Sequence, residues 1–134
     1  MKYLLDTNIC IYVMKQRPES VLRCFHAVDR DEIGLSIVTI AELEYGAAKS
    51  QNPQQNRNRL EHFRQPFQTI SLSDADVQIF GEIRTALERR GTPIGAYDLL
   101  IAAQAKNRGL VLVTNNVREF ERVSGLMLGN WVET

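Results

Sequence analysis

Short apolar runs alternate along this chain with longer segments whose apolar residues recur every three or four positions. Each short run is bounded by turn-forming residues and is too brief for a helix, which favours a buried strand. We therefore predict strands at residues 2–5, 33–36, 69–72 and 110–114. The longer segments predict helices over residues 9–15, 19–28, 38–49, 59–65, 74–90 and 96–106.

This alternation of strands and helices predicts an α/β fold, because consecutive strands joined by helices form a parallel sheet. The polar segment 50–58 contains Pro53, and we expect a loop or the first turn of a helix there. A chain of 134 residues is long enough for one core, so we expect a single domain over residues 1–134.

The helix expected over residues 74–90 has the clearest boundaries. Asp74 and Asp76 lie near its start, and Gly91 follows two arginines at its end. Helical spacing predicts one buried face made of Val77, Phe80, Ile83 and Leu87.

Charge and cysteine content restrict the classes of function. The 16 Lys and Arg residues equal the 16 Asp and Glu residues, so any contact with nucleic acid must be local. Cys10 and Cys24 have neither metal-site nor disulfide-framework spacing, which indicates reduced thiols. No stretch approaches the roughly 18 apolar residues of a membrane span. We expect a cytoplasmic protein that does not enter a membrane.

Acids and amides fall where the predicted strands end. Asp6 follows the first strand, and Glu42 and Asp98 lie in the first turns of two helices. Asn115 and Asn116 follow the strand 110–114. In open α/β sheets the carboxyl ends of the strands form the ligand-binding edge, so these side chains are expected to converge.

Each of these residues also has a purely structural explanation. Thr39 and Glu42 match a helix-capping box, Asp98 would complement a helix dipole, and Asp6 would form a turn. Their convergence favours chemistry, because clustered carboxylates repel one another unless a cation neutralises them. Oxygen ligands of this kind suit Mg²⁺ or Mn²⁺.

Four motifs resemble the PIN-domain ribonucleases, and most closely the VapC toxins of bacterial toxin–antitoxin pairs. They are "LLDTN", "SIVTIAELEYGA", "PIGAYDLLIAA" and "LVTNNVREFERV", and together they span nearly the whole chain. The resemblance implies a three-layer fold with a central, mainly parallel sheet flanked by helices. It also implies a metal-dependent endoribonuclease in which Asp6, Glu42 and Asp98 bind Mg²⁺ or Mn²⁺.

One position departs from the family pattern. The motif after the last predicted strand usually supplies another aspartate, and Asn116 stands in its place. An amide oxygen can bind a metal or its water but brings no charge, so a second ion is expected to bind more weakly. Glu119 is a candidate substitute, although "VREFERV" is also typical of an ordinary charged helix face, which we favour.

Other residues are weaker candidates. Thr7, Asn8, Thr114 and Asn115 neighbour the acids and would orient ligands or phosphate, with turn or packing roles as the alternative. Candidates for RNA phosphate contacts are Lys49, Arg84, Arg89 and Arg90, although solvated helix faces explain such residues more often. His26 and His62 lie away from the acidic motifs and receive no catalytic role.

The resemblance further implies partners and a target. VapC proteins are generally dimers that a cognate antitoxin inhibits, and they often cleave structured RNA such as tRNA to stop translation. The anticodon region of initiator tRNA is our expectation for the target. Two alternatives stay open. A haloacid-dehalogenase-like phosphatase would need a second aspartate where Asn8 stands, and a non-catalytic RNA- or protein-binding module would keep only the fold.

Overall fold

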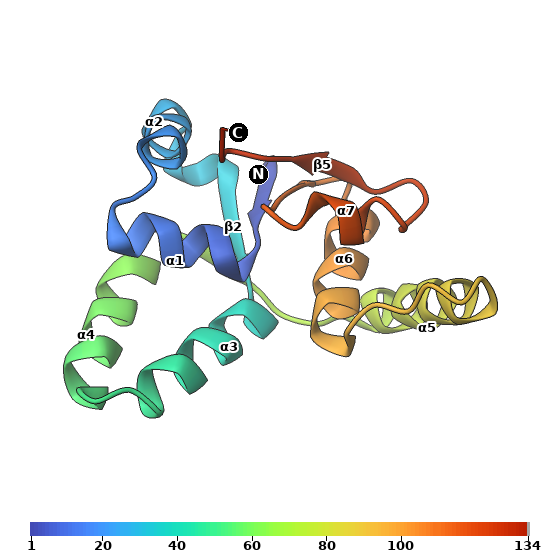
Figure 1. Ribbon diagram of the computed structural model, residues 1–134, viewed down its shortest axis with the longest axis horizontal. Coiled ribbons are helices and arrows are strands. Elements are labelled where there is room, and N and C mark those ends of the chain that lie inside the picture. Colours follow the sequence, from blue (N-terminus) through green and yellow to red (C-terminus); the bar gives the residue numbers. More distant parts are fainter. Residues whose placement is uncertain (134) are drawn as a thin grey trace.

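The computed structural model describes residues 1–133 (Figure 1). Its strands are β1 (Tyr3–Leu5), β2 (Ile33–Ser36), β3 (Gln68–Ile70), β4 (Val111–Val113) and β5 (Met127–Gly129). Its helices are α1 (Thr7–Lys15), α2 (Glu19–Ala27), α3 (Ile37–Ala48), α4 (Pro53–Arg64), α5 (Asp74–Arg89), α6 (Ala96–Arg108) and α7 (Val117–Phe120), with a 3-10 turn η1 (Arg30–Glu32) before β2.

The strands form one parallel sheet in the order β3-β2-β1-β4-β5. In the central strand, Leu4 pairs with Gly34 of β2 and with Leu112 of β4. β1, the first strand of the sequence, is therefore hydrogen-bonded on both sides, and its carboxyl end lies level with those of its two neighbours. The predicted parallel sheet is confirmed.

Helices cover both faces of the sheet, because successive strand residues point to opposite sides. Leu4 and Leu112 pack into a core with α5 and α6, whereas Leu5 and Val113 pack into a second core with α1, α2 and α4. Figure 1 shows these two helix layers on either side of the strands. The three-layer arrangement confirms the fold class.

Some expectations about individual elements were wrong. Val77 is 52% exposed, so the buried face of α5 consists of Ile83 and Leu87, with Phe80 partly covered. Strand β5 was not predicted at all. For the segment 50–58, the helix-start alternative is confirmed: α4 begins at Pro53, because proline at the first helical position needs no hydrogen-bonded N–H, and the rest of the segment is helix.

A buried ion pair fastens α5 to α6. Asp76 is fully buried, and its carboxylate accepts hydrogen bonds from Arg108 Nη1 at 2.5 Å, Asn107 Nδ2 at 2.9 Å and the Ser73 N–H at 2.9 Å. Burial disfavours the charge, but these donors outweigh it and hold the pKa of Asp76 at about 2. The two helices are thereby joined at the end of α6 opposite Asp98. No described helix is both long and apolar enough to cross a membrane.

Candidate active site

Asp6 is held rigidly at the end of the central strand. Its Oδ1 accepts a hydrogen bond from the Thr7 N–H at 2.8 Å and so caps α1, while its Oδ2 accepts one from Thr114 Oγ1 at 2.8 Å. Thr114 follows β4, the parallel neighbour of β1. Burial raises the pKa of Asp6, against the effect of these two bonds. Asp6 is therefore a helix N-cap rather than a turn-former: capping occupies one carboxylate oxygen, and the other is held by Thr114.

Glu42 faces Asp6 from α3. The N-cap of this helix is Ser36, whose side chain accepts from the Val38 N–H at 3.0 Å, so the proposed capping box of Thr39 and Glu42 was wrong. Instead, Glu42 Oε1 accepts a hydrogen bond from Thr7 Oγ1 at 2.7 Å. Thr7 thus links the two acids, because its N–H donates to Asp6 and its hydroxyl donates to Glu42.

Asp98 lies in the first turn of α6, as expected, and close to the other acids. Its partial burial, followed by the negative charges of Asp6, Glu119 and Glu42, raises the pKa of Asp98 to about 7. A hydrogen bond with the Glu119 carboxyl group contributes in the same direction. The structure therefore brings four carboxylates into one electrostatic group at the carboxyl edge of the sheet.

Glu119 belongs to this group, so our preference for an ordinary charged helix face was wrong. The amide of Asn116 donates a hydrogen bond to the Glu119 carboxylate, and the Asn116 N–H donates to Thr114 Oγ1 at 2.9 Å. Asn116 is the N-cap of α7 and Glu119 is its third residue. The sequence signal for the position of Glu119 was this N-x-x-E spacing. A glutamate at the third helical position can reach back to the N-cap residue, and here the N-cap follows β4.

Asn115 turns away from the acids. Its Nδ2 donates to Tyr12 Oη at 3.4 Å, and its Oδ1 accepts from Asn130 Nδ2 at 3.3 Å. Asn8 lies nearer to Asp6 along α1, and its side-chain oxygen is buried with no hydrogen-bond donor within residues 1–133. A buried acceptor of this kind suits an external donor, such as a water on a bound cation.

The chemistry of these donors fits a divalent cation. Within residues 1–133, no three acidic, histidine or cysteine side chains form a ready-made set of ligands for one ion. Mg²⁺ usually binds through only one or two carboxylates and keeps several waters, so it needs no such cage. The available donors are all oxygens, and they carry a charge that the protein itself does not neutralise.

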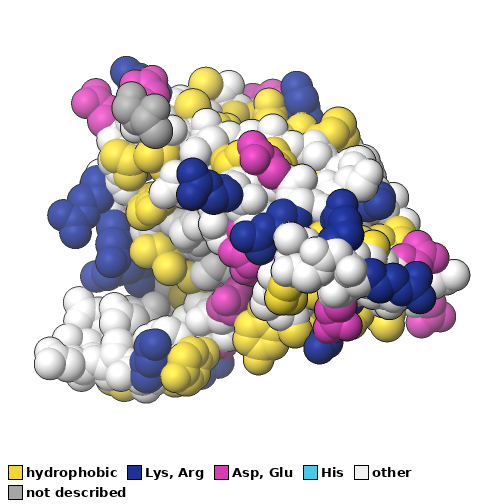
Figure 2. Space-filling view, turned by 45° about the vertical axis from the view of Figure 1, so that its right-hand side comes forward, with side chains coloured by type: hydrophobic (Ala, Val, Ile, Leu, Met, Phe, Trp, Pro, Cys, Tyr) yellow, Lys and Arg dark blue, Asp and Glu magenta, His cyan; other side chains and the backbone are white. Residues whose placement is uncertain are grey.

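The four predicted phosphate-binding cations lie outside the acidic group. Lys49 packs over the Tyr45 ring, Arg84 pairs with Glu88 at 3.2 Å, and Arg90 donates to the Arg122 carbonyl at 2.7 Å. Arg89 and Arg90 line a shallow pocket near the end of α5. Their contact with RNA stays a prediction. Figure 2 shows Lys and Arg side chains on both sides of a narrow group of Asp and Glu side chains.

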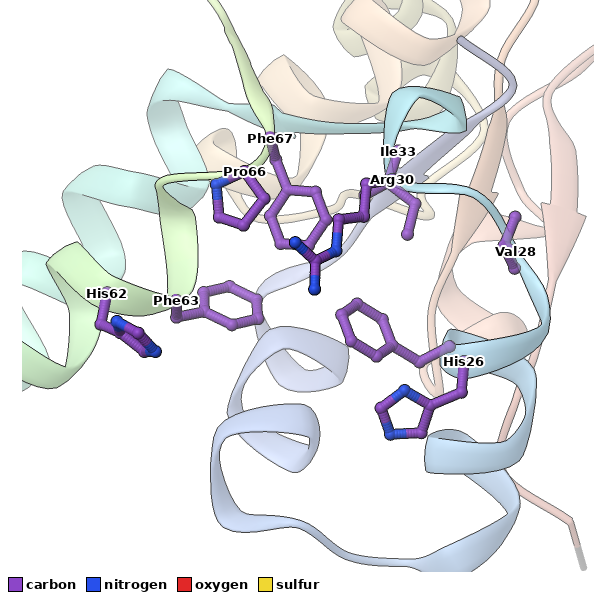
Figure 3. Close-up of a pocket in the computed structure, with 9 residues that line it drawn as sticks. His26, Val28, Arg30, Ile33, His62, Phe63, Pro66 and Phe67 are labelled. Carbon is purple, nitrogen blue, oxygen red and sulfur yellow. The ribbon is translucent and has the colours of Figure 1, made fainter.

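An aromatic pocket of about 370 Å³ lies elsewhere, between α2 and the end of α4. Ile33 and Phe67, which line it, stand where β2 and β3 begin, so it is at the edge of the sheet opposite the acids. Figure 3 shows Arg30 reaching in beside Phe63, with His26 and His62 at the rim. Both histidines are therefore distant from the acidic edge.

The chain resembles proteins of known family throughout its length. Residues 3–126 match the PIN domain family. The tRNA(fMet)-specific endonuclease VapC of Shigella flexneri is 44% identical over 131 residues, which cover 98% of each chain. A ribonuclease VapC of Haemophilus influenzae is 43% identical over 132 residues, or 98% of this chain and 99% of its own.

Solved structures agree with the sequence comparison. The DNA-bound VapBC of Salmonella typhimurium superposes with a TM-score of 0.92 at 40% identity, covering 98% of this chain and 99% of that one. Both the sequence and the fold thus match the same group along almost all of the chain. This protein belongs to the PIN-domain family, and within it to the VapC group.

Proposed function

We propose that this protein is a metal-dependent endoribonuclease and the toxin of a toxin–antitoxin pair. The observation that carries the proposal is the group of Asp6, Glu42, Asp98 and Glu119, in which partial burial, together with the repulsion among the acids, raises the pKa of Asp98 to about 7. Such a group costs stability unless a cation occupies it. The names of the Shigella and Haemophilus relatives, an endonuclease and a ribonuclease, support RNA hydrolysis.

Each residue has a specific part in this proposal. Asp6 and Asp98 would hold Mg²⁺ or Mn²⁺, and Glu42 would bind the ion directly or through a water. When bound, such an ion would supply Lewis-acid chemistry at the scissile phosphate and lower the pKa of a water. Thr114 and Thr7 fix the orientation of Asp6, and Thr7 also holds Glu42. Asn116 holds Glu119 beside Asp98 and so supplies the fourth acid indirectly.

We propose structured RNA as the substrate, with the anticodon region of initiator tRNA as the target, so that cleavage inhibits translation in the cytoplasm. The specificity named for the Shigella relative supports this target. We also propose a cognate antitoxin that binds across the acidic edge, and a homodimer within the complex. The Salmonella VapBC structure supports an antitoxin partner. Light scattering of the free protein at micromolar concentration would contradict the homodimer if it gave the mass of one chain.

The test is cleavage of total cellular RNA by the antitoxin-free protein with Mg²⁺, Mn²⁺ or EDTA, beside Asp6→Asn. Asparagine is also a good N-cap, so the variant keeps the cap of α1 and should fold. We expect discrete metal-dependent cleavage that the variant lacks, with equal circular dichroism spectra. Absence of cleavage by folded wild type in all three conditions would instead favour a non-catalytic binding module.

A further inference from the structure

A groove leads away from the acidic group between α1, α3 and α4. Its volume is about 350 Å³, and Glu42 lines the end next to the acids. The floor is apolar and consists of Ile11, Met14, Leu43 and Leu60. This volume is at the lower end of the range for pockets that hold small ligands, so the groove would admit one nucleotide rather than a duplex.

Two cations line the same groove from opposite sides. Lys15 comes from the last turn of α1 and Arg59 comes from α4, and both are exposed. Neither forms an ion pair or a side-chain hydrogen bond with any residue of 1–133, unlike Arg57, which pairs with Glu44 at 3.7 Å. The charges of Lys15 and Arg59 are therefore available to a ligand.

We infer that this α1–α3–α4 groove binds the nucleotide next to the scissile phosphate, with Lys15 and Arg59 on RNA phosphate and the apolar floor under the base. The inference rests on the proposed ribonuclease function. Four carboxylates repel an approaching phosphate, so cations beside them are needed to hold the strand. Glu42 is the only acid that lines the groove within the described residues, and it lies at the catalytic end. Proteins hold single-stranded RNA by cations along its backbone, and the aliphatic floor of this groove offers the base apolar contact in place of aromatic stacking.

The test replaces the two cations singly and together, as Lys15→Gln and Arg59→Gln. Arg57→Gln is the matched control, because Arg57 is exposed on the same helix but is paired with Glu44 and does not line the groove. Binding is measured in the Asp6→Asn background by fluorescence anisotropy of a labelled anticodon stem-loop of initiator tRNA. Cleavage kinetics use the same RNA with Asp6 intact.

We expect each groove variant to weaken binding about fivefold at low salt and to lower the slope of log K against log salt by about 0.7. In cleavage assays KM rises about fivefold and kcat stays within about twofold, because the lost contact acts equally in the bound substrate and the transition state. Arg57→Gln should change neither quantity. Thermal melting shows that all variants remain folded.

Other outcomes separate this inference from the proposed function. Wild type that cleaves RNA, with groove variants that behave like Arg57→Gln, would overturn the groove assignment and leave the ribonuclease intact. Unchanged RNA binding together with weaker antitoxin binding would show that the groove is a protein-binding surface. Wild type that neither binds nor cleaves RNA would overturn both.

Discussion

The two ends of α6 hold a buried and a half-buried carboxylate in opposite environments. Near its C-terminal end, Arg108 and Asn107 donate to Asp76, whose pKa is about 2. In its first turn, Asp98 faces three other acids, and its pKa is about 7. The C-terminal end of α6 therefore satisfies an acid of α5 completely, whereas its first turn carries an acid whose charge the protein leaves unpaired.

The difference separates residues that stabilise the fold from residues reserved for chemistry. Asp76 contributes stability because its charge is favoured more in the folded chain than in water. The charge of Asp98 is disfavoured in the folded chain and therefore lowers its stability. The apolar cores on the two faces of the sheet supply enough free energy of folding to offset this loss. An acid without a counter-charge, fixed on a rigid helix, is a mark of a functional site.

Asp98→Asn should have the largest effect on function. We expect cleavage to fall about 1,000-fold, equivalent to about 4 kcal/mol in the activation barrier, because a charged metal ligand is lost. The free energy of unfolding should stay equal or rise, since a repelled charge is removed. Initial cleavage rates and urea denaturation measure the two quantities. A variant that retained half of the activity would contradict the assignment of Asp98 as a ligand.

Asp76→Asn should have the opposite profile. It leaves Arg108, whose side chain is only 28% exposed, without its counter-charge, and we expect the protein to lose about 3 kcal/mol of unfolding free energy. Cleavage by the folded fraction at low temperature should be unchanged. Glu88→Gln, which breaks the exposed pair with Arg84, is the control and should cost less than about 0.5 kcal/mol. If both variants lost the same unfolding free energy, burial of the Asp76–Arg108 pair would not explain its contribution to stability.

Glu119→Gln and Asn116→Ala test which residue replaces the missing aspartate. We expect Glu119→Gln to lower the cleavage rate about 30-fold, because a charge of the acidic group disappears. Asn116→Ala should lower it only about threefold, since the Asn116 N–H still donates to Thr114 and Glu119 remains. Single-turnover kinetics at saturating Mg²⁺ distinguish the two. If Asn116→Ala lowered the cleavage rate more than Glu119→Gln, Asn116 rather than Glu119 would be the residue that replaces the missing aspartate.

The smallest effect concerns pH. In EDTA, the folded chain holds a proton on Asp98 up to about pH 7, whereas the unfolded chain releases it near 3.8. Solvent reaches Asp98 and screens its charge, so we count only about 1 kcal/mol of this shift. The melting temperature should therefore fall by about 3 °C as the pH rises from 4 to 7, and Mg²⁺ should reduce this slope by competing with the proton. Asp98→Asn should reduce the slope to the part that Asp6, whose pKa is also raised by burial, contributes. The contribution of Asp76 has the opposite sign and is lost as the pH falls from about 4 toward 2.

The sequence predicted the parts of the molecule that follow local rules. Strand ends in a parallel sheet share one edge, so the order of strands and helices along the chain was enough to place Asp6, Glu42 and Asp98 together. Strand β5 could not be predicted, because Met127, Leu128 and Gly129 are only partly covered and become a strand through pairing with β4.

The remaining errors have physical causes of the same kind. The single turn of α7 is too short to show a periodicity, so the direction of Glu119 depends on the hydrogen bond from Asn116. Val77 was assigned to the core because of its helical spacing, but the buried position in the first turn of α5 belongs to Asp76, which pairs with Arg108 of α6. The presence of Lys15 and Arg59 in one groove requires that α1 and α4 both pack against α3, which no local pattern encodes.

The strand order also determines when the proposed toxin becomes dangerous to the cell that makes it. Synthesis proceeds from the N-terminus, so Asp6 and β1 leave the ribosome early, whereas β4, Thr114 and Glu119 come late. Because β1 lies between β2 and β4, Asp6 gains its hydrogen bond from Thr114 only after β4 has paired beside it. The acidic group also needs Glu119, which follows β4. The proposed activity therefore requires a nearly complete chain.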